Sequence, residues 1–133
     1  MQVNPTRRCV ALLLASAFVF AAPTALHAQT YPSKTIKLVV PFGPGGPTDV
    51  AARVVSQVLQ SSLGQSVVIE NRPGAGGATG TSAVARSAPD GYTMLVTTGA
   101  FVILPAVRND LTYDTLNDLR GITNYASVPI VIV

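Results

Sequence analysis

Three short apolar stretches, rich in β-branched residues, are separated by longer segments with helical spacing. The stretches lie at residues 35–42, 66–71 and 92–98, and their pattern predicts strands. The first begins by alternating and ends continuously apolar, which is typical of a strand buried on both faces of a sheet. Residues 49–64 and 81–88 are predicted helices.

The first predicted helix carries its apolar residues at helical spacing on one side. These residues are Val50, Ala51, Val54, Val55, Val58 and Leu59. We expect one face of this helix to pack on the sheet, while the other face is only mildly polar. Thr48 is the predicted N-cap and Gly64 the predicted C-terminal stop.

The order strand, helix, strand, helix, strand predicts an α/β fold with an open, doubly wound, mostly parallel sheet. Beyond it, residues 101–111 predict a short helix interrupted near Pro105, and residues 112–123 predict a loop followed by a turn of helix. Residues 127–133 form an apolar run without a stop signal. Because such a run makes an exposed, sticky sheet edge, we expect it to lead into a further domain.

Two glycine-rich loops, residues 43–48 and 72–80, each join a predicted strand to a predicted helix. The carboxyl ends of parallel strands share one edge of the sheet, and ligands bind in the crevice there. A helix N-terminus presents free backbone N–H groups and a partial positive charge, and glycine lets a ligand approach the backbone closely. The two loops therefore predict a site for a carboxylate or a phosphate, although such loops are also common as simple turns.

Phosphate-binding motifs match these loops poorly. The first loop lacks the lysine of a Walker motif, and neither loop has the G-x-G-x-x-G spacing of a dinucleotide site. Asp49, in the first predicted turn of the helix, would repel phosphate and would suit a ligand with an amine or amide beside its carboxylate. Thr97 and Thr98, at the end of the third strand, can offer hydroxyl groups to the same crevice or serve only as β-formers.

The N-terminus has the layout of a secretory signal peptide. Arg7 and Arg8 precede an uncharged apolar run of 13 residues, Val10 to Ala22, and a cleavage point follows Ala28. The run is too short for a membrane span, which needs roughly 20 residues. We therefore expect residues 1–28 to be removed and the mature protein to lie in a bacterial periplasm.

Removal of residues 1–28 also removes the single cysteine and the single histidine. Without them the mature chain has no Ser-His-Asp or Cys-His nucleophile system. A zinc site would have only carboxylates as side-chain ligands, whereas zinc sites normally include cysteine or histidine. Seven basic and six acidic residues remain, a net charge of +1, without the basic cluster that nucleic-acid binding requires. We expect no catalytic residue, no metal, no cofactor and no nucleic-acid partner.

Three segments resemble one family closely. They are "YPSKTIKLVVPFGPGGPTDVAAR", "LGQSVVIENRPGAGGATGTSAVARSAPDGYTML" and "LTYDTLNDL". They are similar to the solute receptors of tripartite tricarboxylate transporters, the Bug-type periplasmic binding proteins. The resemblance covers essentially all of residues 31–133 and combines three specific motifs.

The resemblance implies a two-domain protein that closes on a small organic acid like a flytrap and holds its carboxylate with the two glycine-rich loops. The ligand-binding residues that it implies are Phe42, Gly45, Gly46, Asp49, Gly76, Gly77, Ala78, Thr79, Thr97 and Thr98. Leu104 stands where many relatives have asparagine, and residues 99–103 are more apolar than is common there. These departures point to a less polar ligand.

We therefore expect a monomeric periplasmic receptor that delivers di- or tricarboxylates, or related amino acids or amides, to membrane transporter subunits. Residues 29–126 would form an incomplete first domain, and residues 127–133 would begin the crossover to a second. Two alternatives stay open on the sequence: a nucleotide-binding, Rossmann-like enzyme, and a non-functional truncated receptor fragment.

Overall fold

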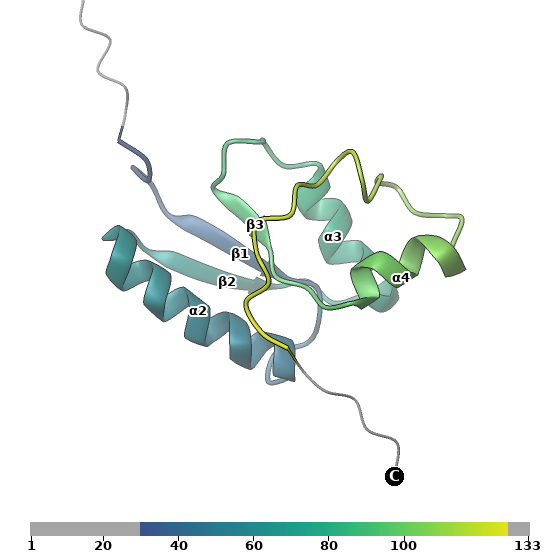
Figure 1. The fold of residues 1–133 in the computed structure, drawn as a ribbon, viewed down its shortest axis with the longest axis horizontal. Helices are drawn as coiled ribbons and strands as arrows, with labels where there is room; N and C mark the ends of the chain where they lie inside the picture. The colour runs from purple at the N-terminus through teal and green to yellow at the C-terminus, as the bar shows by residue number, and fades with distance from the viewer. Residues whose placement is uncertain (1–29, 128–133) are drawn as a thin grey trace, which may run out of the picture.

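The computed structural model describes residues 30–127. The predicted signal peptide, residues 1–28, and nearly all of the apolar run at 127–133 lie outside the described residues. The described part is a small parallel sheet with helices on both of its faces (Figure 1). This arrangement confirms the predicted α/β, doubly wound fold.

The sheet has three parallel strands in the order β2-β1-β3. The central strand is β1 (Ile36–Val40), and its neighbours are β2 (Val67–Asn71) and β3 (Thr93–Leu95). Val40 pairs with Asn71 at the carboxyl end of the sheet. The register therefore brings the ends of β1 and β2, and the loops that follow them, to the same edge.

Helices cover both faces of β1. On one face α2 (Pro47–Leu63) packs against β1 and β2. On the other, α3 (Ala78–Ala85) packs against β1 and β3, and α4 (Ala100–Val107), which follows β3 in the chain, contacts α3 (Figure 1). The buried core cluster comprises Ile36, Leu38, Val40, Ala52, Val67 and Val96. The intervening Val39 is also buried, so β1 is enclosed on both faces, as its apolar sequence predicts.

Helix α2 begins earlier than predicted. Its N-cap is Gly46, Pro47 occupies the first helical position, and Thr48 lies buried in the first turn without a capping hydrogen bond. The proline, whose fixed φ suits a helix start and which has no N–H to satisfy, moves the start upstream of Thr48. The prediction for the other end is confirmed: Gly64 is left-handed, with φ 65°, and its N–H donates to the Gln60 carbonyl at 3.1 Å.

Only part of the predicted apolar face of α2 packs on the sheet. Leu59 packs against the core cluster and Val55 is half-buried, as predicted. Val50, Val54 and Val58 are instead more than half exposed, and the small residues Ala52 and Ser56 are buried against the sheet. Small side chains let the helix approach the strands closely, so the packing face is rotated from the centre of the apolar spacing.

Three further boundaries shift. A 3₁₀ turn, η1 (Ala75–Gly77), leads directly into α3, so this helix begins three residues before the predicted 81. β3 is shorter than the predicted 92–98, and α4 runs through Pro105 instead of breaking there. Residues 112–123 contain only a single turn, in which the Asp118 N–H donates to the Asp114 carbonyl.

Candidate functional site

The two glycine-rich loops meet at the carboxyl edge of the sheet. One follows β1 and leads into α2, and the other follows β2 and leads through η1 into α3. They are in contact, since a Cβ added to Gly77 would lie 3.6 Å from both Phe42 Cζ and Pro41 Cβ. Eight of the ten predicted site residues therefore lie on these two adjoining loops and the helix starts that follow them. Four belong to each loop.

The first loop positions the N-terminus of α2 at the edge of the sheet. Gly45 has a φ of +82° and Gly46 is the extended N-cap. The N–H groups of Thr48 and Asp49 belong to the first helical turn, where no intrahelical acceptor exists. Together with the helix dipole they form a local electropositive end that favours a bound anion.

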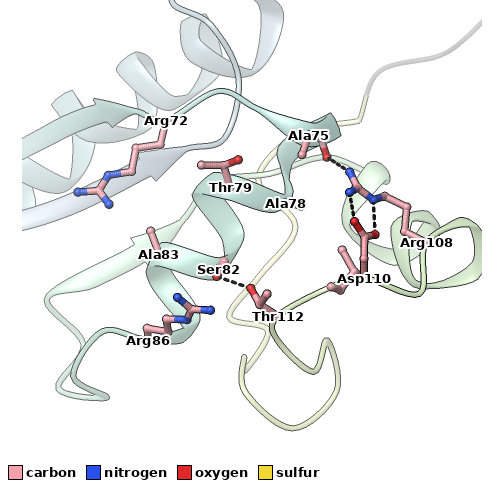
Figure 2. Close-up of a pocket in the computed structure, with 11 residues that line it drawn as sticks. Arg72, Ala75, Ala78, Thr79, Ser82, Ala83, Arg86, Arg108, Asp110 and Thr112 are labelled. Atoms are coloured by element: carbon pink, nitrogen blue, oxygen red, sulfur yellow. Dashed lines mark hydrogen bonds and ion pairs between the residues drawn. The ribbon is translucent and has the colours of Figure 1, made fainter.

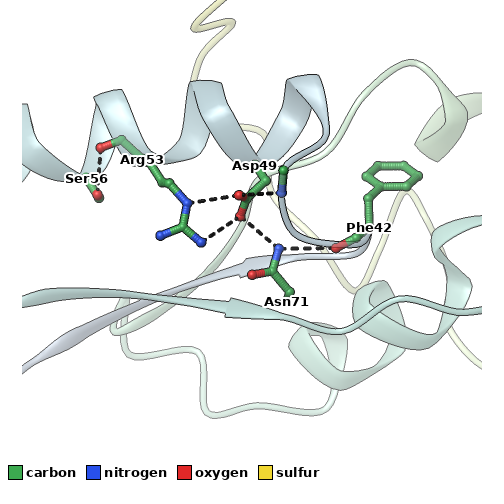
Figure 3. A network of polar contacts seen from close by, with 6 residues as sticks. Phe42, Asp49, Arg53, Ser56 and Asn71 are labelled. Carbon is green, nitrogen blue, oxygen red and sulfur yellow. Dashed lines mark hydrogen bonds and ion pairs between the residues drawn. The ribbon is translucent and has the colours of Figure 1, made fainter.

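Asp49 is the centre of a buried polar network (Figure 3). Its carboxylate accepts from the Gly45 N–H at 3.0 Å, from Arg53 Nε at 2.9 Å and from Asn71 Nδ2 at 2.9 Å. Only 2% of the side chain is exposed, against 55% for Arg53. The Arg53 guanidinium, the Gly45 N–H and the Asn71 amide together lower the pKa of Asp49 from 3.8 to about 2.

Asn71 extends this network to the other loop. Its Nδ2 also donates to the Phe42 carbonyl at 3.2 Å, so one amide joins the end of β2 to the first loop and to Asp49. The Asp49 carboxylate thus joins the first loop, α2 and the end of β2. The sequence reasoning missed Asn71, although a polar side chain at the end of a buried strand is a recognisable signal.

The second loop has a positive φ at four successive residues. Gly74, Ala75, Gly76 and Gly77 have φ of 142°, 51°, 68° and 103°. Ala78 and Thr79 then open α3, where Ala78 is half-buried and Thr79 exposed. The buried Thr81 hydroxyl donates to the Gly77 carbonyl at 2.8 Å, which secures the loop to the first turn of α3.

Gly80 allows α3 to pack closely against the residues that begin both loops. A Cβ at this position would lie 2.8 Å from Pro41 Cα and 2.9 Å from the Arg72 carbonyl oxygen, both closer than Cβ atoms approach in proteins. Only glycine allows this approach, and the two atoms belong to the residues that lead into the two loops. The sequence shows the glycine but not the neighbours that require it.

Thr97 and Thr98 follow β3 at the same edge of the sheet. Thr97 is half-buried and its carbonyl accepts from the Tyr125 hydroxyl at 3.5 Å. Thr98 is exposed, and its hydroxyl accepts from the Ala100 N–H at 3.4 Å. The Thr98 hydroxyl therefore contacts the start of α4 in addition to any contact with a ligand.

A groove of about 530 Å³ lies beside the second loop, between α3 and the segment that follows α4 (Figure 2). Three arginines line it. Arg72 pairs with Glu70 and Arg108 with Asp110, whereas the exposed Arg86 has no ion pair among residues 30–127. Carboxylates therefore balance two of the three guanidinium charges, and Arg86 leaves one net positive charge along the groove.

Within residues 30–127, no group of three or more histidine, cysteine, aspartate or glutamate side chains is placed to hold a metal ion. Over the same residues, none of the helices is both long and apolar enough to cross a membrane. The chemistry that the site offers is hydrogen bonding from backbone N–H groups in an electropositive setting.

Comparison with solved structures identifies the fold. The chain is similar to the periplasmic binding protein BugD, with a TM-score of 0.64 and 41% identity over 66% of the chain and 29% of BugD. It is also similar to MatC from Rhodopseudomonas palustris, solved with bound malate, with a TM-score of 0.61 and 38% identity over 66% of the chain and 30% of MatC. The fold is that of a periplasmic binding protein.

The sequence comparisons identify the family. A profile of the tripartite tricarboxylate transporter family receptors (TctC) matches residues 51–133. The chain is 44% identical to protein BugT of Bordetella pertussis over 135 aligned positions, which cover 98% of the chain and 40% of BugT. The chain belongs to the TctC receptor family, and it spans well under half the length of BugT.

Proposed function

We propose that this chain provides one wall of a periplasmic receptor for small carboxylated metabolites. The ligand carboxylate is held at the carboxyl edge of the sheet by backbone N–H groups of the two glycine-rich loops. The observation that carries the proposal is the direct contact between the loops, with the Asp49–Asn71 network locking them together. MatC, which has a similar fold, was solved with malate, and this supports a dicarboxylate as ligand.

The proposed contacts divide into two kinds. Gly46 and Gly76, together with the first-turn residues Thr48 and Asp49, offer backbone donors to the ligand. The N–H groups of Gly45, Gly77, Ala78 and Thr79 donate within the protein and shape the two loops, and Phe42 forms the wall between the loops. Asp49 holds the first loop in place, and Thr97 and Thr98 border the site from β3. We propose that this set binds the ligand by hydrogen bonds, without covalent chemistry.

The setting of the receptor is also part of the proposal. Residues 1–28 direct export and are cleaved after Ala28, the mature chain is monomeric in the periplasm, and the ligand passes to membrane subunits of a tripartite transporter. The family and the periplasmic relatives support this setting. Closure on the ligand requires a second wall.

A titration of the ¹⁵N-labelled chain with malate, followed by NMR, tests the carboxylate site. At up to about 10 mM malate we expect chemical-shift changes centred on the backbone amides of the two loops, because NMR detects even millimolar affinity. Malamide, the uncharged diamide of the same acid, is the matched control and should cause no such change. Equal responses to both compounds, or shifts confined to other surfaces, contradict the proposal.

Two alanine variants in one loop sharpen the test. Gly45→Ala places an L-residue at a φ of +82° and should weaken malate binding roughly tenfold, since this backbone costs about 1–2 kcal/mol. Gly43→Ala meets nothing within 4 Å and has no positive φ, so it should bind like the wild type.

Binding of NAD or ATP in preference to malate would instead favour the nucleotide-dependent alternative.

A further inference from the structure

The second glycine-rich loop depends on support from outside itself. Ala75 is the only non-glycine residue with a positive φ among residues 30–127, at 51°. Its carbonyl already accepts from the Ala78 N–H inside η1. A left-handed alanine between glycines is a backbone that relaxes readily unless its neighbours hold it.

Arg108, from a distant part of the chain, stabilises this backbone by a hydrogen bond. Its Nη1 donates to the Ala75 carbonyl at 3.3 Å, 33 residues earlier in the sequence (Figure 2). Arg108 caps the end of α4, and its own N–H donates to the Leu104 carbonyl at 2.9 Å. Leu104 is buried, and a Cβ added to Gly76 would lie 3.5 Å from its Cδ2. The end of α4 therefore meets the loop at two neighbouring residues.

Asp110 fixes the orientation of that guanidinium. Arg108 Nε donates to Asp110 Oδ1 at 2.8 Å and Nη2 donates to Oδ2 at 2.5 Å, which is a two-bond fork. A fork of this kind fixes the plane of the guanidinium and leaves Nη1 for the Ala75 carbonyl. Arg108 also brings a positive charge next to the loop, where an anion is proposed to bind.

We propose that Arg108, oriented by Asp110, is a positioning residue for the second glycine-rich loop and thereby sets its affinity for a carboxylate. The proposal rests on the proposed function for its consequence, but the contact itself is independent of any ligand. Because Arg108 acts through the Ala75 carbonyl, its removal should loosen residues 76–79 while the sheet stays intact.

The test compares four variants of the purified chain: Arg108→Ala, Arg108→Lys, Asp110→Asn and Arg86→Ala. Amide hydrogen exchange at residues 76–79, without ligand, should be about tenfold faster in Arg108→Ala, because a hydrogen bond from a charged donor is lost. Arg108→Lys should restore part of the protection, and Asp110→Asn should lie between the wild type and Arg108→Ala. Arg86→Ala is the matched control, because Arg86 lines the same groove at the far end of α3 from Ala75 (Figure 2), and it should leave the exchange at residues 76–79 unchanged.

Malate affinity measured on the same variants should fall in the same order. Unchanged exchange at 76–79 in Arg108→Ala overturns the proposal, and a loss of malate binding without faster exchange means that Arg108 contacts the ligand directly. If Arg108→Ala does not fold, the exchange of Asp110→Asn decides. If the wild type binds no malate but exchange follows the expected order, the proposed function fails while the positioning role stands.

Discussion

Asp49 shows how one residue organises the first loop. Its carboxylate receives donors from the loop, from α2 and from β2, and it is almost fully enclosed. An acidic residue in the first turn of a helix also interacts favourably with the helix dipole. The same residue that discourages phosphate at this helix start therefore holds the backbone donors in place.

Titration of Asp49 should be visible in the pH dependence of stability. Its folded pKa, about 2, lies below the ordinary value of 3.8, so its ionised form stabilises the fold above pH 4, and this contribution is lost as the pH falls from 4 to 2. Asp49→Asn should be less stable than the wild type at pH 7, because the charge-assisted bonds to Arg53 and Gly45 are lost. Urea unfolding of both proteins at several pH values should show the difference shrinking between pH 4 and 2. A difference that stays constant over this range would mean that Asp49 does not titrate as described.

At the scale of elements, the packing of α3 decides how close the two loops come. The helix lies against β1 and β3, and Gly80 permits its contact with Pro41 and Arg72. On the other face of the sheet, Asp49 at the start of α2 bonds to Asn71 at the end of β2. The small residues Ala52 and Ser56 lie on the same side of α2 as Asp49 and are buried against the sheet.

Gly80→Ala separates packing from helix propensity. Alanine should stabilise the interior of an exposed helix by about 1 kcal/mol. Here its Cβ would lie under 3.0 Å from backbone atoms of Pro41 and Arg72, which cannot move without shifting both loops. We expect a net destabilisation of about 1–3 kcal/mol in urea unfolding, as for overpacked cores.

Gly121→Ala is the control for this substitution, because nothing lies within 4 Å of the added Cβ. It should change stability by no more than about 0.5 kcal/mol. A Gly80→Ala variant that proved more stable than the wild type would show that α3 can move outward without cost.

At the scale of the whole molecule, the chain presents one wall of the proposed cleft. It spans 40% of BugT and about 30% of MatC. Flytrap receptors gain much of their affinity from ligand contacts with both walls after closure. A single wall offers the carboxylate loops without those further contacts.

Residues 29–133 alone should therefore bind malate weakly. We expect a Kd above roughly 0.1 mM, since few contacts are left to offset the entropy lost on binding. Isothermal titration calorimetry measures this directly, with malamide as the control ligand. Micromolar binding by residues 29–133 would show that one wall suffices and that closure adds little.

Local sequence pattern is sufficient to predict the order of strands and helices, the parallel sheet and the place of the two loops. These features depend on local pattern: apolar runs of strand length, helical spacing, and glycines at the junctions. The left-handed stop at Gly64 and the enclosure of β1 on both faces belong to the same class, because a single residue type or a short run suffices to specify them.

The residues on which the loops depend are selected by packing between distant parts of the chain. Asp49 at the start of α2 bonds to Asn71, 22 residues away, on the side of the helix that faces the sheet, while Val50, Val54 and Val58 face outward. The support of Ala75 by Arg108 and the seat of Gly80 on Pro41 likewise join residues far apart in the sequence. Local sequence patterns do not specify such pairings. A charged residue can form an ion pair, and a small residue can allow close packing, at many places in a fold, and the packing of the whole chain selects one of them.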